Sequence, residues 1–364
     1  MFKSLRIKNF RCFPEITIDN IERINLIGGV NNVGKTALLE AIFLLNSLNS
    51  IEIPFELNFN RGVIQQPTFD IEEICEWLFY QKQIGKSIKI QTIDENGEER
   101  ELKLSLHKAL SPRLFPLSSK TNSRKTIKDL KLELKKAGQK LLEFTAFITI
   151  NKEGEIRIEF QQDEKQEIEE IQLFYPIVFH SSRLKVSSIE DATVFSHFAR
   201  KNEQNEINEI VEILQIVEPR LKRLEILVTG GIPIIHGDIG GDNLIPVVLM
   251  GEGMGRLLSM ILSIMNTRGG IVLIDEIENG IHYSAMEKVW QSINIATRKF
   301  NTQLFATTHS YECIHAAHRA FSDSESYNFR YFRLEREKET NSIKSLVYDK
   351  DNIETSLGLS WEMR

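Results

Sequence analysis

Residues 28–36 read GGVNNVGKT, and two apolar runs flank them, INLI at 24–27 and ALLEAIFLL at 37–45. The stretch fits the pattern G-x-x-x-x-G-K-[ST], with Gly29, Gly34, Lys35 and Thr36 at the fixed positions. Glycines allow successive backbone N–H groups to converge on phosphate oxygens, and the N-terminus of a following helix adds partial positive charge. The stretch therefore predicts a loop that holds nucleotide phosphates between a strand and a helix.

This phosphate loop (residues 28–36) also assigns roles to single side chains. Lys35 is expected to reach the β- and γ-phosphates of ATP, and the Thr36 hydroxyl is expected to ligate Mg²⁺. The residues expected to bind the nucleotide here are Gly29, Asn31, Asn32, Val33, Gly34, Lys35, Thr36 and Ala37. A glycine-rich turn with an exposed lysine is the alternative, and the flanking strand and helix patterns argue against it.

A second apolar run ends in two carboxylates. The run IVLIDE spans 271–276 and places Asp275 and Glu276 at its carboxyl end. Buried parallel strands present the residues at that end to the crevice where ligands bind. We expect Asp275 to hold the Mg²⁺ shell and Glu276 to orient or deprotonate the attacking water. The alternative is that the pair simply begins an exposed helix.

A third apolar strand ends in a histidine. The run QLFATTHS spans 303–310, with His309 at its tip, one strand–helix unit after Asp275 and Glu276. A histidine at that position can reach the γ-phosphate or the attacking water, although a lone histidine is often structural. Glu276, His309 and Lys35 are the predicted catalytic residues.

The composition limits the other classes of function. No apolar stretch approaches the roughly 20 residues that span a bilayer, so no membrane association is expected. Three cysteines, Cys12, Cys75 and Cys313, share no metal-binding spacing and suggest a reducing cytoplasm. The net charge of -6 gives no global reason to expect nucleic-acid binding.

Alternation of apolar strands and helices predicts an α/β fold with a mainly parallel sheet flanked by helices, preceded by N-terminal antiparallel strands. The long separation between Lys35 and Asp275 predicts a compact α+β insertion, because hairpin patterns and no heptads occupy it. We expect residues 1–50 and 226–364 to form the two parts of the nucleotide-binding head, and residues 51–225 to form a lid or accessory region.

The ordered motifs LRIKNFRCF (5–13), the phosphate loop, GEGMGRLLSMILSI (251–264), IVLIDEIENGIHYS (271–284) and QLFATTHSYECI (303–314) resemble the ABC-type ATPase heads of the SMC and RecF class. Within that class, the sequence most resembles the bacterial OLD-like AAA ATPases of the anti-phage defence type. The resemblance implies an ABC/SMC-like P-loop head that closes face to face with a second copy around ATP, as a homodimer or higher even oligomer.

The resemblance also implies further contacts to the nucleotide. Gly251, Glu252 and Gly253 match the loop that meets the γ-phosphate from the other subunit, and Arg11 matches an arginine that contacts nucleotide phosphates. The chain departs from the usual Leu-Ser-Gly-Gly-Gln by reading MGEGM at 250–254, and His282 stands where an aspartate is usual. These departures leave open how far a second subunit completes the site.

OLD-type proteins carry a TOPRIM nuclease after the ATPase. The only trace of its metal site is Asp-x-Asp in YDKDN (348–352), and because the chain ends twelve residues later we expect a hairpin turn there. By resemblance, a nuclease effector on a separate polypeptide is expected instead.

The distribution of charge raises the question of whether DNA is a further partner. Residues 108–140 carry ten Lys or Arg and two acids, whereas 152–170 carry eight acids and three bases. The basic stretch could bind a nucleic-acid backbone. A solvated connector balanced by its acidic neighbour is the slightly favoured alternative.

Together these features predict an ATP- and Mg²⁺-dependent ATPase whose paired heads gate an effector or DNA. Two alternatives stay open: a nucleotide-gated scaffold with negligible hydrolysis, and a RecF-like DNA repair ATPase. A GTPase is disfavoured, because NKEG at 151–154 has glycine where a guanine-binding Asp is needed.

Overall fold

The computed structural model describes residues 1–46, 53, 57–58, 61, 75–108, 126–136, 139–150, 156–162, 175–182, 188–200, 204–322 and 327–358. The chain divides into two compact units. The first unit comprises Met1–Asn20, Asn32–Phe174 and Glu335–Ser345, and the second comprises Ile21–Asn31, Tyr175–Leu334 and Leu346–Arg364. The division falls inside the phosphate loop, after Asn31.

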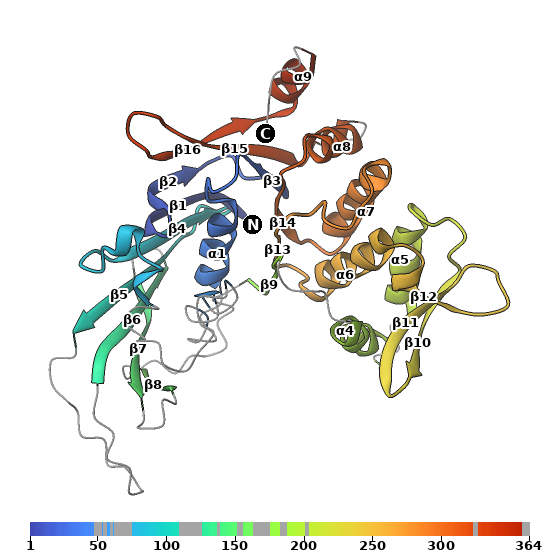
Figure 1. Cartoon of the computed structure of the whole chain (residues 1–364), viewed down its shortest axis with the longest axis horizontal. Coiled ribbons are helices and arrows are strands. Elements are labelled where there is room, and N and C mark those ends of the chain that lie inside the picture. Colours follow the sequence, from blue (N-terminus) through green and yellow to red (C-terminus); the bar gives the residue numbers. More distant parts are fainter. Residues whose placement is uncertain are drawn as a thin grey trace, which may run out of the picture. The chain divides into compact units, whose positions relative to one another are not determined.

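The first unit is built on an antiparallel sheet (Figure 1). Among the described residues seven strands form it, in the order β2-β1-β4-β5-β6-β7-β8. The strands are β1 (Phe2–Phe10), β2 (Phe13–Ile18), β4 (Ile88–Asp94), β5 (Glu99–Lys108), β6 (Thr126–Lys136), β7 (Gln139–Ile150) and β8 (Ile156–Gln162). The insertion after the phosphate loop thus continues the sheet that the N-terminus begins.

The helix after the phosphate loop, α1 (Lys35–Asn46), belongs to this unit and contacts β4. Leu5, Ile7, Ile88 and Ile90 alternate with polar residues on β1 and β4 and are buried, as period-2 strands require. Most of α1 is buried as well. Because β4 and α1 are both buried and in contact, the start of α1, where Lys35 and Thr36 lie, has a fixed position in this unit.

The second sheet carries the motif strands. Within the part of the chain that the structure describes, six strands run in the order β16-β15-β3-β14-β13-β9. Their bounds are β3 (Ile24–Gly28), β9 (Ile177–His180), β13 (Ile271–Ile274), β14 (Gln303–Thr307), β15 (Phe329–Arg336) and β16 (Ile343–Tyr348). The pairings β15–β3, β3–β14, β14–β13 and β13–β9 are parallel. The carboxyl ends of β3, β13 and β14 therefore share one edge of this sheet.

Helices of the second unit pack in one buried cluster with Val272 and Ile274 of β13 and with Leu304 and Ala306 of β14 (Figure 1). These helices are α4 (Ser188–Arg200), α5 (Gln204–Gln215), α6 (Glu252–Asn266), α7 (Met286–Lys299) and α8 (Tyr311–Ser322). β13 and β14 are buried at every position. A near-continuous apolar run of this kind is typical of a strand covered on both faces.

The remaining elements are small. A hairpin of β10 (Arg223–Thr229) and β11 (Ile232–Asp238) pairs with β12 (Ile245–Pro246) and leads into the turn η2 (Val247–Leu249). The short helices η1 (Tyr80–Lys82) and η3 (Tyr283–Ala285) and the helix α9 (Lys350–Gly358) complete the described part.

The expected α/β fold with N-terminal antiparallel strands and a mainly parallel sheet is confirmed. Two local predictions are wrong. The YDKDN stretch is not a hairpin turn, because Asp349 accepts a hydrogen bond from the backbone N–H of Asn352 and starts α9. Part of the Lys-rich stretch is not a connector, because residues 126–136 pair as β6 between β5 and β7. Residues 109–125 lie outside the described residues.

Candidate functional site

The phosphate loop has the backbone that its sequence predicts. Gly29, Asn32 and Gly34 have φ values of 132°, 61° and 100°. Glycine adopts positive φ without steric cost, and asparagine tolerates it better than most residues. These angles curl the chain between β3 and α1, which is the condition for several N–H groups to face one anion.

Gly34 is also required for space. A Cβ at this position would lie 2.6 Å from Sγ of Cys12, in the turn that joins β1 and β2, and 2.7 Å from the ring of Phe13, the first residue of β2. The carbonyl of Gly34 accepts the first helical hydrogen bond of α1 from Leu38 at 2.9 Å. The β1–β2 turn thus holds the end of the loop, next to the buried Lys35.

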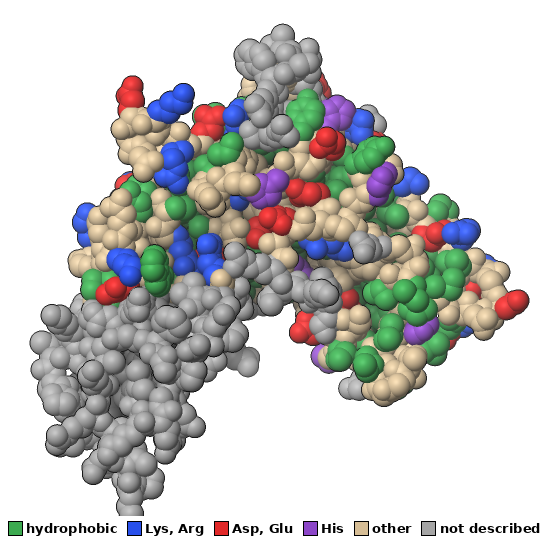
Figure 2. Space-filling view, in the orientation of Figure 1, with side chains coloured by type: hydrophobic (Ala, Val, Ile, Leu, Met, Phe, Trp, Pro, Cys, Tyr) green, Lys and Arg blue, Asp and Glu red, His purple; other side chains and the backbone are tan. Residues whose placement is uncertain are grey.

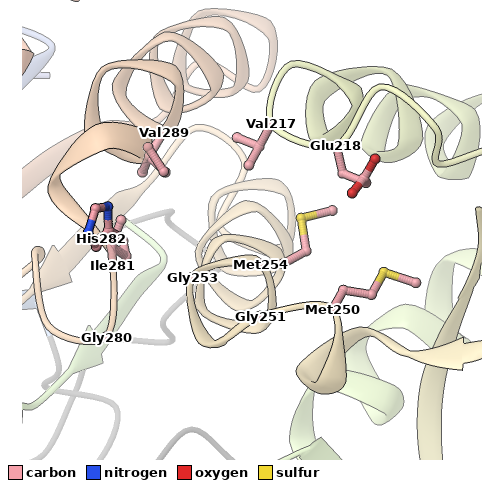
Figure 3. A pocket seen from close by; sticks show the side chains of 11 residues that line it. Val217, Glu218, Met250, Gly251, Gly253, Met254, Gly280, Ile281, His282 and Val289 are labelled. Atoms are coloured by element: carbon pink, nitrogen blue, oxygen red, sulfur yellow. The ribbon is translucent and has the colours of Figure 1, made fainter.

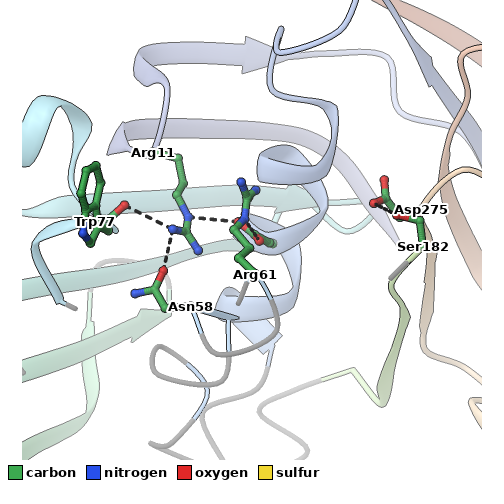
Figure 4. Close-up of polar contacts among 7 residues, drawn as sticks. Arg11, Asn58, Arg61, Trp77, Ser182 and Asp275 are labelled. Atoms are coloured by element: carbon green, nitrogen blue, oxygen red, sulfur yellow. Dashed lines mark hydrogen bonds and ion pairs between the residues drawn. The ribbon is translucent and has the colours of Figure 1, made fainter. Parts of the chain in front are cut away.

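Arg11, predicted by resemblance to contact phosphate, lies in this same turn with φ 52° (Figure 4). Its Nε donates to Glu40 Oε2 at 3.1 Å, and its Nη1 donates to Asn58 Oδ1 at 2.6 Å and to the Trp77 carbonyl at 3.3 Å. Arg61 also binds Glu40, from Nε to Oε1 at 2.6 Å.

Nη2 of Arg11 is buried and has no hydrogen-bond partner within the described part of the chain. Burial lowers the pKa of Arg11, and the carboxylate of Glu40 acts in the opposite direction. Glu40 therefore fixes a charged guanidinium beside the phosphate loop with one donor atom unused. A contact between Arg11 and the nucleotide stays a prediction.

Asp275 directly follows β13 and is held by two hydroxyl groups, of which that of Ser182 is drawn in Figure 4. Thr307 Oγ1 donates to Asp275 Oδ1 at 2.6 Å, and Ser182 Oγ donates to Oδ2 at 3.1 Å. The backbone N–H of Asp275 donates to the carbonyl of His180 at 2.8 Å. Sequence reasoning missed Ser182, two residues after β9, and Thr307, the last residue of β14.

Glu276 and His309 are brought together. His309 Nε2 lies 3.3 Å from Glu276 Oε1, and both side chains are about one-third exposed. Asn279 Nδ2 donates to Glu276 Oε2 at 2.6 Å, and Glu278 Oε1 accepts the backbone N–H of His309 at 2.7 Å. The sequence predicts Glu276 and His309 as catalytic residues. It did not single out Glu278 and Asn279, which follow the buried Ile277.

The donor set for a divalent cation fits Mg²⁺. No group of three or more His, Cys, Asp or Glu side chains gathers in the described residues. Mg²⁺ needs less, because it keeps several waters and binds one or two protein groups together with substrate phosphates. In the second unit, the buried carboxylate of Asp275, oriented by two hydroxyl groups, offers an oxygen ligand of that kind, and in the first unit Thr36 at the start of α1 offers another.

The signature-like loop (residues 250–253) begins α6. Gly251 is the N-cap of α6, with φ 127° and no side-chain capping bond, so the first N–H groups of the helix lack a side-chain cap. A Cβ on Gly253 would lie 3.7 Å from the Gly280 carbonyl oxygen and 3.8 Å from the Ile281 Cα. The loop therefore packs against the segment that follows Asp275 and Glu276.

A pocket of about 630 Å³ opens beside the signature-like loop (Figure 3). Val217 and Glu218 after α5, Met250 and Met254 of the loop region, and His282 line parts of it. His282 is the N-cap of η3 and accepts from the backbone N–H of Ser284. Its side chain is thus engaged in a local contact with Ser284.

A family model with the description "AAA domain, putative AbiEii toxin, Type IV TA system" matches residues 24–314. The match covers most of the chain, including the phosphate loop, Asp275, Glu276 and His309, so the chain belongs to this family. With those motifs in place, the chain is a P-loop ATPase that binds and hydrolyses ATP.

Two relatives in sequence extend this comparison. An "ATP/GTP phosphatase" of Helicobacter pylori (strain ATCC 700392 / 26695) is 22% identical over 327 residues, which cover 86% of each chain. The "Uncharacterized protein MJECL10" of Methanocaldococcus jannaschii is 43% identical over 47 residues, or 13% of this chain and 22% of that protein.

Solved structures with similar arrangements include SMC heads. The "SmcHead bound to the C-winged helix domain of ScpA" matches with a TM-score of 0.49 and 12% identity, covering 97% of this chain and 99% of that one. The "SMC head domain from Thermotoga maritima" matches with a TM-score of 0.43 and 13% identity, covering 96% and 99%. In the described part of this chain, no helix combines the length and apolar character needed to cross a bilayer.

Proposed function

Because the chain belongs to this AAA-domain family, we propose that it is a Mg²⁺-dependent ATPase of the cytoplasm whose copies pair through their heads around ATP, and that pairing gates a separate effector. The observation that carries the hydrolytic part is the Glu276–His309 pair, 3.3 Å apart at adjacent strand ends. The name of the Helicobacter pylori relative supports release of phosphate from ATP or GTP.

Hydrolysis in this proposal depends mainly on positioning and neutralisation of charge around an in-line water. The Glu276 carboxylate orients that water and accepts its proton, while His309 donates toward the γ-phosphate. Lys35 neutralises charge on the β- and γ-phosphates. Asn279 and His309 each contact one oxygen of Glu276, and the remaining lone pairs of the carboxylate are available to the water.

Thr36 and Asp275 are the residues proposed to hold Mg²⁺. When bound, the cation would neutralise charge on the β- and γ-phosphates. Ser182 and Thr307 keep the Asp275 carboxylate in one orientation, which prepares it for that role without further rearrangement of the side chain.

Pairing is supported by the signature-like loop. Gly251, Glu252 and Gly253 begin α6 without a side-chain cap, and helix N-termini bind anions such as the phosphate of a nucleotide held by another copy. Exposed apolar side chains also gather over the β10–β11 hairpin and η2 just before this loop (Figure 2). They are Leu227, Val228, Ile232, Val248 and Leu249. An apolar patch of this kind supports contact with another protein chain.

The effector is proposed to be a separately encoded nuclease of an anti-phage system, with the chain related to OLD-like ATPases. The support is the resemblance in motif order. Co-expression with the product of a neighbouring gene, followed by a nuclease assay with and without ATP, tests this part. Nuclease activity that ignores ATP would count against gating.

DNA is the second candidate partner, in a role like that of RecF. A groove of about 510 Å³ on the first unit is lined in part by Arg6, Lys8, Lys86 and Lys89. Lys8 and Lys89 are directly opposed on β1 and β4, so their charges repel unless an anion lies between them. Glu15 pairs with Arg6 and Lys8 and reduces the excess charge.

Binding of duplex DNA across a salt series tests this candidate. If DNA binds in the groove, Lys86→Ala with Lys89→Ala weakens binding and reduces its salt dependence. An unchanged affinity would exclude this surface.

Phosphate release by the wild-type protein and by Glu276→Gln tests the hydrolytic mechanism, with ATP binding measured in parallel. The proposal expects release by the wild type only, and retained ATP binding by both. Equal release by both proteins contradicts the role of Glu276, and no release by either with intact ATP binding favours a nucleotide-gated scaffold.

A further inference from the structure

One arginine connects the signature-like loop to the catalytic segment. Arg256 lies on the first turns of α6, shortly after Gly251 and Gly253. Its Nη2 donates to the backbone carbonyl of Glu276 at 2.9 Å. The element that would face a second copy is therefore bonded directly to the residue that would act on this copy's own nucleotide.

The Glu276 backbone is held from both sides. Its N–H donates to Thr307 Oγ1 at 2.8 Å, and its carbonyl accepts from Arg256. Its φ of 51° lies in the left-handed region, which is unfavourable for a residue with a side chain. Strained backbone persists only when its surroundings impose it, so these two bonds determine where the Glu276 carboxylate points.

Arg256 and Glu278 each carry one buried polar atom that makes no hydrogen bond among the described residues. Arg256 Nε, a donor, and Glu278 Oε2, an acceptor, are both buried without a hydrogen-bond partner among the residues described. Burial lowers the pKa of Arg256, and Glu278 is the carboxylate that opposes this most. The other oxygen of Glu278 already holds the backbone of His309.

An unpaired buried donor and an unpaired buried acceptor each carry a desolvation penalty, which a mutual hydrogen bond would remove. A shift of α6 relative to the segment after β13 would supply that bond. Gly253 packs against Gly280 and Ile281, so a force on the signature-like loop acts directly on the contact between α6 and this segment.

We propose that Arg256 is a positioning residue that transmits movement of the signature-like loop to Glu276, and that in the active state it pairs with Glu278 and thereby also fixes His309. The inference rests on the proposed pairing of heads around ATP. Occupancy of the signature-like loop by one nucleotide then sets the geometry for hydrolysis of the other.

Arg256→Ala and Arg256→Lys test the role of this side chain in steady-state ATP hydrolysis. We expect Arg256→Ala to lower kcat at least tenfold with KM for ATP changed less than twofold, because the bound phosphates are not touched. Lysine can reach only one of the two acceptors, so Arg256→Lys should recover part of kcat. Thermal melting of each variant checks that it is folded.

Arg268→Ala is the matched control. Arg268 follows the other end of α6 and pairs with Glu206, away from Glu276. We expect the wild-type kcat in this variant. An equal loss of kcat in Arg256→Ala and Arg268→Ala would overturn a specific role for Arg256, as would an unchanged kcat in Arg256→Ala.

Glu278→Gln completes a double-mutant cycle, since glutamine can still accept the His309 N–H but carries no charge. If Arg256 and Glu278 pair during turnover, the combined loss of kcat in Arg256→Ala/Glu278→Gln is at least threefold smaller than the product of the single losses. If the loss of kcat in the double variant equals the product of the two single losses within twofold, the pairing is overturned. Wild-type protein that releases no phosphate overturns the proposed function and this inference together, whereas an active wild type isolates the inference.

Discussion

The hydroxyl of Thr307 donates a hydrogen bond to the carboxylate of Asp275 across 2.6 Å. The same hydroxyl accepts the backbone N–H of Glu276, so one side chain at the end of β14 orients both acidic residues at the end of β13. The parallel pairing of β13 with β14 makes this arrangement available, because it aligns the two strand ends.

Thr307→Val should therefore damage stability and catalysis together. Valine keeps the shape but leaves the Glu276 N–H without its partner, and a buried unsatisfied group costs about 1–3 kcal/mol. We expect urea unfolding to show a loss in that range and kcat to fall at least tenfold. Thr307→Ser, which keeps the hydroxyl, is the control and should retain most of the stability and most of kcat. A wild-type kcat in Thr307→Val would contradict this account.

Gly34→Ala should abolish tight ATP binding. Its Cβ would meet Cys12 Sγ at 2.6 Å, and its φ of 100° is unfavourable for alanine. Gly97 in the β4–β5 turn offers a matched control, because its φ is also positive, 77°, but no heavy atom lies within 4 Å of its Cβ position. Gly97→Ala should lose about 1 kcal/mol of stability and no ATP affinity. Equal ATP affinities in the two variants would show that the steric contact is unimportant.

His309→Ala should lower kcat about a hundredfold, as expected for loss of a group that transfers protons or stabilises charge in the transition state. KM for ATP should change little, since the phosphate loop remains intact. His315→Ala on α8 is the control, because the described structure records no contact between His315 and the phosphate loop, Asp275 or Glu276. Single-turnover hydrolysis measures the effect; a fall in ATP affinity equal to the fall in kcat would indicate a binding role instead.

Asp191 predicts a specific dependence of stability on pH. Burial raises the pKa of this carboxyl from 3.8 to about 6, although Ser259 Oγ donates to it. Because the folded-state pKa is raised, folding favours the protonated form. The stabilisation is complete below pH 3.8 and is lost as pH rises through about 6.

Asp191→Asn mimics the protonated carboxyl at every pH. We expect it to match the wild type near pH 4 and to exceed it above pH 7 by at most about 3 kcal/mol. His180, whose pKa burial lowers to about 4, titrates in the same range with the opposite sign, but it is present in both proteins and cancels in the difference. A difference in unfolding free energy that does not vary with pH would contradict the prediction.

The sequence predicts the parts of this site that local pattern determines. GGVNNVGKT requires a curled backbone wherever it occurs, and apolar runs that end in Asp275 or His309 indicate strand tips. These patterns were enough to predict the α/β class, the strands β13 and β14, and the places of Glu276 and His309 beyond the strand ends, whereas the contact between these two side chains is seen only in the structure.

The contacts that the sequence did not predict depend on strand order. Ser182 reaches Asp275 only because β9, a short strand within PIVFH, pairs beside β13 across a long separation in sequence. α9 begins directly after Asp349 because the side chain of this residue accepts a backbone N–H. Aspartates make the same kind of bond in many turns, so the sequence YDKDN does not distinguish a helix start from a turn. Arg256 likewise gives no signal in sequence, since an arginine on an amphipathic helix is usually solvated.

The central claim is that ATP brings two heads together and that Glu276 then hydrolyses it. Sedimentation velocity of Glu276→Gln with Mg²⁺, in the presence and absence of ATP, tests it most directly, because a trapped nucleotide should preserve the paired state. The account predicts a doubling of mass with ATP and reversal when ATP is removed. The same mass in both conditions, with ATP shown to be bound, would contradict it.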